Sequence, residues 1–214
     1  PDIIVSDVMM PRMNGYKLCK TIKEDINISH IPVILLTARD DRQSQISGYK
    51  NGADGYLSKP FEVEMLMELI RNRLKNREYT KKRYLNAGLI PTPEESTISL
   101  TDETFLIKLN SIIQENIENS NLGIQFICQE VGLGRSSLYN KLKALTGMGA
   151  NEYISKLRIE KAITLISGTD MPFSEIAEKT GFTTPSYFST AFKQYTGETP
   201  SQYKERKKKG LAGK

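Results

Sequence analysis

The chain contains 214 residues, of which 38% are hydrophobic and 26% charged, and its formal net charge is +5. This length allows two domains, the apolar content suffices for folded cores, and no apolar run approaches the length of a membrane-spanning helix. The two cysteines, Cys19 and Cys128, fall in apolar helical patterns of different predicted domains, so we expect no disulfide and a cytoplasmic location. The single histidine, His30, is expected to be structural, because one histidine without partners makes no metal site.

The first 79 residues alternate between short apolar runs and amphipathic stretches. The apolar runs lie at residues 3–5, 33–36 and 55–57, and helical stretches fall near residues 14–24, 41–51 and 61–77. Short apolar runs that alternate with helices are typical of buried parallel strands in an α/β sheet. We therefore predict an α/β domain with a parallel sheet over residues 1–79.

A polar residue stands at the end of each predicted strand. Asp7 ends the first strand, Thr37 the second and Lys59 the third. Functional groups of such sheets gather at the carboxyl ends of the strands. An acid, a hydroxyl and an amine at one edge suit a phosphoryl site, with the acid as nucleophile and the other two groups holding phosphoryl oxygens. The simpler alternative is three unrelated side chains that face water.

The surroundings of these residues resemble the receiver domain of response regulators. The resemblance rests on Met10-Pro11 and Gly15 after Asp7, on Ala38 after Thr37 and on Pro60 after Lys59. It implies a flavodoxin-like, doubly wound sheet in which Asp7 is the phospho-acceptor and Thr37 and Lys59 sense the phosphate. It also implies that Asp7 and the backbone carbonyl of Met9 bind Mg²⁺. Tyr56 matches the aromatic switch position of receivers, although ordinary packing on the sheet would also explain it.

The chain departs from the complete receiver pattern at its start. Pro1 leads directly into what corresponds to the third receiver strand, so we expect a truncated domain. Mg²⁺ prefers several oxygen ligands, and the acidic pair that receivers supply is missing from the chain, so we expect an incomplete Mg²⁺ site. The strand at residues 2–6 would form an exposed sheet edge, which favours self-association through that edge.

A linker is predicted over residues 80–101. Residues 78–90 continue a basic helix, and residues 91–101 then interrupt it with two prolines and small polar residues. The next helix is predicted over residues 102–119, with Thr101 or Asp102 as its cap.

The rest of the chain contains one segment twice, at residues 132–153 and 181–203. Gly132 corresponds to Gly181, and Tyr153 corresponds to Tyr203. Each copy follows a short helical pattern and places a glycine where two crossed helices need a tight turn, as in helix-turn-helix modules. We predict one module at residues 124–146, a second at 173–195, and a helix at 150–167 between them. Eighteen helical residues span about 27 Å, which suits two helices that enter successive major grooves. Two hairpins of a structural helical bundle are the alternative.

Each second helix of the repeat divides into an apolar and a polar face. Phe188, Phe192 and Tyr195 form the predicted buried stripe of the later copy, and Leu138, Leu142 and Leu145 that of the earlier copy, where Lys141 is expected on the outer side. The side chains that we predict to contact DNA are Arg135, Ser136, Tyr139, Asn140, Lys143, Ser186, Ser189, Thr190 and Lys193. Asparagine pairs bidentately with adenine, serine and threonine are permissive, and the lysines suit phosphates.

Residues 103–206 resemble the AraC/XylS-type DNA-binding domain. The later copy carries most of the signature, in Ile176-Ala177, Gly181-Phe182, Tyr187-Phe188, Phe192-Lys193, Gly197, Thr199-Pro200 and Tyr203. The earlier copy departs from it at Cys128, Gly134 and Ala150, which leaves its base contacts less defined than its architecture. The domain is predicted over residues 102–206, and residues 207–214 as a basic tail.

The two resemblances together are those of a hybrid two-component regulator. They imply a transcriptional regulator that binds double-stranded DNA, is controlled by aspartyl phosphorylation, and receives phosphate from a histidine kinase domain on the same or another polypeptide. A homodimer and the cytoplasmic end of a membrane-bound sensor are the expected setting. The alternatives are a protein-interaction module built on the helix-turn-helix pair and an enzyme that uses Asp7 and Lys59. No catalytic histidine pattern or metal cluster in the sequence favours an enzyme.

Overall fold

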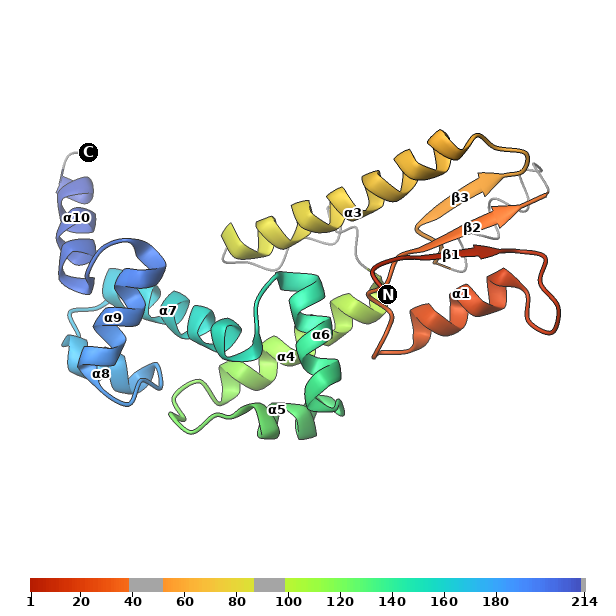
Figure 1. Ribbon diagram of the computed structural model, residues 1–214. Coiled ribbons are helices and arrows are strands. Elements are labelled where there is room, and N and C mark those ends of the chain that lie inside the picture. Colours follow the sequence, from red (N-terminus) through yellow and green to blue (C-terminus); the bar gives the residue numbers. More distant parts are fainter. Residues whose placement is uncertain (39–51, 87–98, 213–214) are drawn as a thin grey trace. The chain divides into compact units, whose positions relative to one another are not determined.

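The computed structural model describes residues 1–38, 52–86 and 99–212. These residues form two compact units (Figure 1). The first consists of Pro1–Ile107 and Ser136–Gly147, and the second of Lys108–Arg135 and Met148–Lys214. Within the described ranges, no helix is both long and apolar enough to cross a lipid bilayer.

The first unit is built on a parallel sheet. The strands β1 (Ile4–Asp7), β2 (Val33–Thr37) and β3 (Gly55–Ser58) lie in the order β1-β2-β3 and run in one direction (Figure 1). Asp7 pairs in register with Leu36, and Thr37 pairs with Ser58, so the three strands end together. The predicted parallel sheet is thus confirmed. The helix expected at residues 41–51 lies outside the described residues.

Helices cover both faces of this sheet. Val33 and Leu35 point to one face, where they pack with Cys19 of α1 (Gly15–Glu24). Ile34 points to the other face, where Leu69 of α3 (Val63–Asn86) packs beside the strands. Because both faces are buried, the strands consist of nearly continuous apolar residues instead of an alternating pattern. A helix was predicted at residues 61–77, with a basic continuation from residue 78. The structure confirms both in α3, which ends at Asn86.

The loop between β1 and α1 is tightly constrained. Asn14 caps α1 by accepting a hydrogen bond from the backbone N–H of Lys17 at 2.9 Å. Gly15 approaches the preceding strand so closely that an added Cβ would lie 2.5 Å from the carbonyl oxygen of Asp7. Arg12 has a positive φ of 71°, which side-chain-bearing residues rarely adopt. The loop after Asp7 therefore depends on residues whose backbone conformation is specific.

Helix α4 (Leu100–Glu115) begins earlier than predicted, and its cap differs. Ser99 is the cap, because its Oγ accepts from the N–H of Asp102 at 3.2 Å. The prediction of Thr101 or Asp102 as cap was wrong, because both side chains form other contacts. The Thr101 hydroxyl donates to the carbonyl of Lys23, and Asp102 is a buried ion-pair partner.

Helix α6 (Arg135–Thr146) belongs to the first unit from Ser136 onward, whereas the second unit contains α5 (Ile124–Val131) and the helices after α6. The latter are α7 (Ala150–Gly168), α8 (Phe173–Lys179), α9 (Pro185–Thr196) and α10 (Pro200–Ala212). The helices predicted from the repeat thus form at the expected positions. Residues 207–212 were predicted to belong to a basic tail, but they extend α10 as far as Ala212.

The core of the second unit is an aromatic chain. Phe188 stacks against Phe182 with 5.4 Å between ring centroids and against Phe192 with 5.7 Å, and Phe192 contacts Tyr203 at 5.6 Å. These residues come from α9, α10 and the turn before α9, and they pack on Ile159 of α7. The aromatic residues of the signature thus hold four segments together.

Tyr195 does not join this core, contrary to the prediction. It shares the helical stripe of Phe188 and Phe192, but 42% of its surface is exposed. Its hydroxyl is a hydrogen-bond partner of Glu160, and partial burial, with the Glu160 carboxylate, raises the pKa of Tyr195 to about 12. The ring lies along the surface because its polar end requires a partner outside the apolar core.

Candidate phosphoryl site and nucleic-acid interface

The first candidate site lies at the carboxyl edge of the sheet. Asp7 ends β1, and its Oδ2 forms an ion pair with Nζ of Lys59, the residue that follows β3. The other carboxylate oxygen accepts from the backbone N–H of Met9 at 3.0 Å. The backbone N–H of Lys59 donates to the carbonyl of Thr37 at 2.6 Å, which links the ends of β2 and β3. The three residues predicted to converge therefore do meet at one edge.

The Asp7 carboxylate is kept ionised. The hydrogen bond from Lys59, followed by that from the N–H of Met9, holds the pKa of Asp7 below its usual range. An ionised carboxylate at the solvent-exposed end of a strand suits a nucleophile for an electrophilic phosphorus atom. The neighbouring ammonium group of Lys59 would stabilise negative charge on the transferred group.

Two further residues of the site show different environments. Thr37 is only 2% exposed, at the buried end of β2. Tyr56 in β3 is half-buried, packs on the core under α1, and has its hydroxyl 3.4 Å from that of Tyr16. Both predicted functions of Tyr56, as a switch and as a packing residue, are therefore compatible with its position.

The described residues do not form a complete magnesium site. Receiver domains in general bind a divalent metal, and Mg²⁺ takes an octahedral set of oxygen ligands. Among the described residues, Asp7 is the carboxylate that the contacts above place at this edge. Among the residues that the structure describes, no three His, Cys, Asp or Glu side chains gather as a metal-binding group. The predicted ligands Asp7 and Met9 are thus too few by themselves to hold the ion.

The second candidate site is the exposed face of α9. Thr184 caps this helix by accepting from the N–H of Tyr187 at 3.1 Å, and Pro185 occupies its first position. Phe188 and Phe192 are fully buried on one face. Of the four residues predicted to contact DNA here, Ser186, Thr190 and Lys193 are exposed and Ser189 is half-buried. The helix therefore presents short polar side chains and one cation to solvent.

The corresponding helix α6 separates its faces in the same way. Leu138, Leu142 and Leu145 are buried, as predicted. The residues predicted to contact DNA are all exposed, namely Arg135, Ser136, Tyr139, Asn140 and Lys143. Both recognition helices thus present their predicted reading residues opposite a buried stripe.

Lys141 of α6 contradicts its predicted outward position. Its side chain is 0% exposed, and Nζ pairs with Oδ1 of Asp102 and donates to Oγ of Ser29 at 2.7 Å. Ser29 in turn donates to Oδ1 of Asp102 at 2.7 Å. Burial lowers the pKa of the Lys141 ammonium, and Asp102 opposes that shift. We call Ser29, Asp102 and Lys141 the buried polar triad.

The helical spacing could have revealed this burial. Lys141 lies three residues after Leu138 and four before Leu145, so it borders the apolar stripe instead of the polar face. A lysine at such a position can cover the stripe with its alkyl chain or bury its charge against an acid. Nothing in the sequence pattern identifies Ser29 and Asp102 as the partners, because they are remote along the chain.

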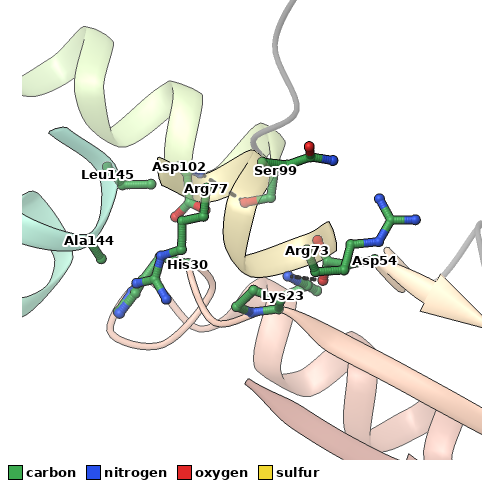
Figure 2. A pocket seen from close by; sticks show the side chains of 11 residues that line it. Lys23, His30, Asp54, Arg73, Arg77, Ser99, Asp102, Ala144 and Leu145 are labelled. Atoms are coloured by element: carbon green, nitrogen blue, oxygen red, sulfur yellow. Dashed lines mark hydrogen bonds and ion pairs between the residues drawn. The ribbon is translucent and has the colours of Figure 1, made fainter. Parts of the chain in front are cut away.

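A small cavity of about 80 Å³ has Asp102, one member of the triad, in its wall (Figure 2). Its lining includes Lys23, His30, Arg77 and Asp102. Nδ1 of His30 is buried and has no hydrogen-bond partner among the described residues. Desolvation, with the positive charges of Lys141 and Arg77, lowers the pKa of His30 to about 4. His30 is therefore a neutral, half-buried side chain, which is compatible with its predicted structural role.

Comparison with known proteins identifies the class. Residues 1–71 match the response regulator receiver domain, and residues 127–206 match a helix-turn-helix domain. The protein named "Probable transcriptional regulator ycf29" of Pyropia yezoensis is 30% identical over 162 residues, which cover 71% of this chain and 73% of that protein. The chain belongs to the response regulators, in the group whose receiver is followed by an AraC-type helix-turn-helix domain. A receiver followed by a helix-turn-helix domain is the domain combination of DNA-binding transcriptional regulators that are controlled by phosphorylation.

Two further proteins are similar to different shares of this chain. "Histidine kinase P4" of Formosa agariphila is 43% identical over 206 residues, which cover 96% of this chain but 15% of that protein. The chain thus spans a small part of this much longer relative. The solved C-terminal domain of AraT, a response regulator from Geobacillus stearothermophilus, is 31% identical and covers 48% of this chain and 84% of that one, with a TM-score of 0.45.

Proposed function

We propose that Asp7 accepts a phosphoryl group from a phosphohistidine of a histidine kinase. A carboxylate oxygen of Asp7 forms the new O–P bond while the P–N bond of the donor breaks, and the imidazole leaves with the electron pair and takes up a proton. The ion pair between Lys59 and Asp7 carries this proposal, because it places a cation beside the attacking oxygens. After transfer, Lys59 and Thr37 would hold the phosphoryl oxygens.

Tyr56 is proposed to respond to that change. Phosphorylation adds negative charge and acceptor oxygens at the carboxyl edge of the sheet. The contact of 3.4 Å between the hydroxyls of Tyr56 and Tyr16 would have to break if the Tyr56 ring turned inward. The surface around β3 would change shape and favour a homodimer, which would place two DNA-binding domains on adjacent sites.

The helix-turn-helix modules are proposed to read two adjacent DNA sites. The division of α9 into a buried aromatic face and an exposed face with Ser186, Thr190 and Lys193 supports this most directly. In α6, Asn140 is the residue best suited to recognise a base, with Ser136 and Tyr139 beside it. Arg135, Lys143 and Lys193 would contact phosphates and fix the register, while Ser186, Ser189 and Thr190 would tolerate several bases.

The setting is proposed to be a hybrid two-component protein that acts on DNA in the cytoplasm. The match to a protein named a histidine kinase, over 96% of this chain and 15% of the relative, supports a parent with its own kinase domain. In that arrangement the donor histidine and Asp7 belong to one polypeptide or to two copies of it. The domain combination fits a non-enzymatic output region.

The phosphorylation proposal is tested in the intact parent protein with Asp7→Asn. We expect no phosphate on the receiver, detected as hydroxylamine-labile label because an acyl phosphate is cleaved by that reagent, and no stimulus-dependent promoter output. Asp2→Asn is the matched control, since Asp2 is exposed near the start of the same segment. Unchanged label and output in the Asp7 variant would contradict the assignment.

The DNA proposal is tested by selecting ligands for the full chain from a random duplex library and titrating the winners with salt. We expect two short motifs about one helical turn apart and an affinity that falls as the salt concentration rises. Binding without sequence preference would contradict the assignment of reading residues.

A further inference from the structure

Within the second unit, helix α7 contacts both the segment that precedes the first helix-turn-helix module and the second module. Towards the preceding segment, Lys161 pairs with Oε1 of Glu118 at 3.1 Å, and the hydroxyl of Tyr153 donates to Oδ1 of Asn110 at 2.9 Å. Towards the second module, Ile159 packs in the same core as the buried aromatic residues of α9. The covalent connection between the modules is therefore supported by side-chain contacts on both sides.

The turn of the second module also touches the segment before α5 directly. A Cβ added to Gly181 would lie 2.2 Å from the carbonyl oxygen of Ile117, so this approach of two backbones requires glycine. The segment is in turn held to the start of α5, because the N–H of Leu122 donates to the carbonyl of Asn119 at 3.0 Å. The second turn therefore rests on a part of the chain that is fixed to the first module.

Arg158 of α7 lies between these two backbones. Its Nη2 donates to the carbonyl of Asn119 at 2.7 Å, and its guanidinium carbon lies 6.0 Å from the ring centroid of Phe182. An added Cβ at Gly181 would also lie 2.8 Å from Nη2, and the whole side chain is only 9% exposed. We call Ile117, Asn119, Arg158, Gly181 and Phe182 the inter-module contact.

The burial of a charged side chain at this contact has a cost in free energy. Desolvation lowers the pKa of the Arg158 guanidinium, and in the part of the chain that the structure describes, its Nε has no hydrogen-bond partner. An apolar side chain of similar size would fill the space without this cost. A planar guanidinium, however, donates in fixed directions and stacks on an aromatic ring, so it specifies one arrangement of its neighbours. This arginine therefore suits a role in orientation better than a role in stability alone.

From these contacts we infer that Arg158 determines how strictly the protein recognises the spacing between its two DNA motifs. This inference rests on the proposed reading of two adjacent sites. While the inter-module contact holds, the second module keeps one orientation relative to α5, the first helix of the other module. One base pair added between the motifs moves the second motif by about 3.4 Å along the DNA axis and by about 35° around it. A fixed pair of modules can follow neither movement, whereas a hinged pair can.

The test compares DNA binding by the full chain and by its Arg158→Met variant. Methionine keeps an unbranched side chain but cannot donate to the carbonyl of Asn119. Ile166→Val is the control, because Ile166 is 3% exposed in the core of the second unit and outside the inter-module contact, so this variant loses packing alone. The ligands are a duplex enriched by the unsubstituted chain from a random library and derivatives with one or two base pairs added or removed between its motifs.

The unsubstituted chain and Ile166→Val should bind the derivatives on the order of 10- to 100-fold more weakly than the enriched duplex, which corresponds to lost base contacts at one motif. Arg158→Met should prefer the same bases within each motif, but its spacing penalty should be at least about fivefold smaller. Equal penalties in Arg158→Met and the unsubstituted chain would overturn the inference and leave the proposed function intact. Failure of the unsubstituted chain to enrich any sequence would remove the proposed function and the inference with it.

Residual dipolar couplings of backbone amides measure the orientation of the modules without DNA. Couplings from α5, α8 and α9 of the unsubstituted full chain should fit one alignment tensor, and those of Arg158→Met should require two. Two tensors in the unsubstituted chain, or one tensor in the variant, would overturn the inference. If Arg158→Met does not fold, Arg158→Lys takes its place in both measurements, because lysine keeps the charge but lacks the planar group.

Discussion

At the scale of single residues, two exposed residues of α6 are proposed to serve different functions. Asn140 and Lys143 are both exposed on α6, yet an amide recognises a base edge and an ammonium group mainly neutralises phosphate. Substitutions at these two positions should therefore separate specificity from salt dependence.

Asn140→Ala should relax sequence preference at one position of the first motif and cost about 1–3 kcal/mol of binding free energy against the preferred base. Lys143→Gln is expected to weaken binding to all sequences alike and to reduce the salt slope by about one. Parallel titrations of preferred and mismatched duplexes at several salt concentrations measure both. The assignment fails if the two variants have the same profile.

His30 gives a prediction for pH. Its folded-state pKa of about 4 lies below the ordinary value of 6.5, because burial and the positive charges of Lys141, Arg77 and Lys23 outweigh the attraction of Asp102. The unfolded state binds more protons between these values, so the stabilising contribution is complete above about pH 6.5 and is lost as the pH falls toward 4. A loss on the order of 1–3 kcal/mol is expected over this window.

This titration can be observed directly, because His30 is the only histidine of the chain. The NMR signal of its imidazole should titrate with a midpoint near pH 4, and His30→Gln should flatten the pH dependence of the melting temperature between pH 6.5 and 4. A midpoint near 6.5 would mean that the imidazole is hydrated, contrary to its buried Nδ1.

At the scale of elements, two turn glycines occupy equivalent positions of the repeat but have different surroundings. Gly132 and Gly181 have φ values of 76° and 74°, a left-handed conformation that favours glycine. An added Cβ at Gly132 would meet no atom within 4 Å, whereas at Gly181 it would lie 2.2 Å from the carbonyl oxygen of Ile117. Substituting each glycine by alanine therefore separates the free-energy cost of the left-handed backbone conformation from the additional cost of a steric collision.

Gly132→Ala is expected to lower the free energy of unfolding by about 1 kcal/mol, the cost of the left-handed conformation alone. Gly181→Ala should cost about 3 kcal/mol or more, because backbone atoms must also move. Chemical denaturation of both variants under one set of conditions tests this. Similar losses at the two sites would show that the second turn relaxes easily.

Gly15 performs a different function at the start of α1, beside the strand that carries Asp7. Its φ is unremarkable, but an added Cβ would lie 2.5 Å from the Asp7 carbonyl oxygen. Gly15→Ala should push the loop away from β1 and slow phosphorylation of Asp7 by at least about tenfold, because 1 Å of displacement at a reacting group is costly. The hydroxylamine-labile label in the intact parent protein provides the measurement, and an unchanged rate would show that the helix shifts instead of the loop.

The sequence predicted most of these elements because their signals are local or repeated. Asp7, Thr37 and Lys59 could be brought together from sequence because parallel strands end at one edge, and the repeat located α8 and α9 within a residue or two. The triad was missed because it depends on contacts between segments far apart in the chain. The Ser99 cap was missed because it depends on which side chain accepts from the backbone N–H of Asp102, and periodicity does not reveal that. The exposure of Tyr195 was missed because its hydroxyl has Glu160 as a partner outside the apolar core, and this partner decides the position of the ring more strongly than periodicity does.

At the scale of the whole molecule, charge is localised instead of spread evenly. The net charge of +5 would suggest general attraction to DNA, but residues 91–214 contain 15 Lys or Arg against 14 Asp or Glu. Residues 131–151 carry Arg135, Lys141 and Lys143 without any acid, and Lys141 is neutralised by Asp102. DNA affinity should therefore depend on few cations, with a modest salt slope and a large share of specific contacts.

The buried polar triad has a consequence for engineering. A chimaeric sensor could be made by joining the receiver of another protein to this output domain at the linker. Here such an exchange would place a foreign loop against Lys141, and any replacement for Ser29 without a hydroxyl would leave a buried ammonium group with one partner fewer. A transplanted receiver would need to bring its own match for Lys141 and Asp102, so these two modules are less interchangeable than their separate folds suggest.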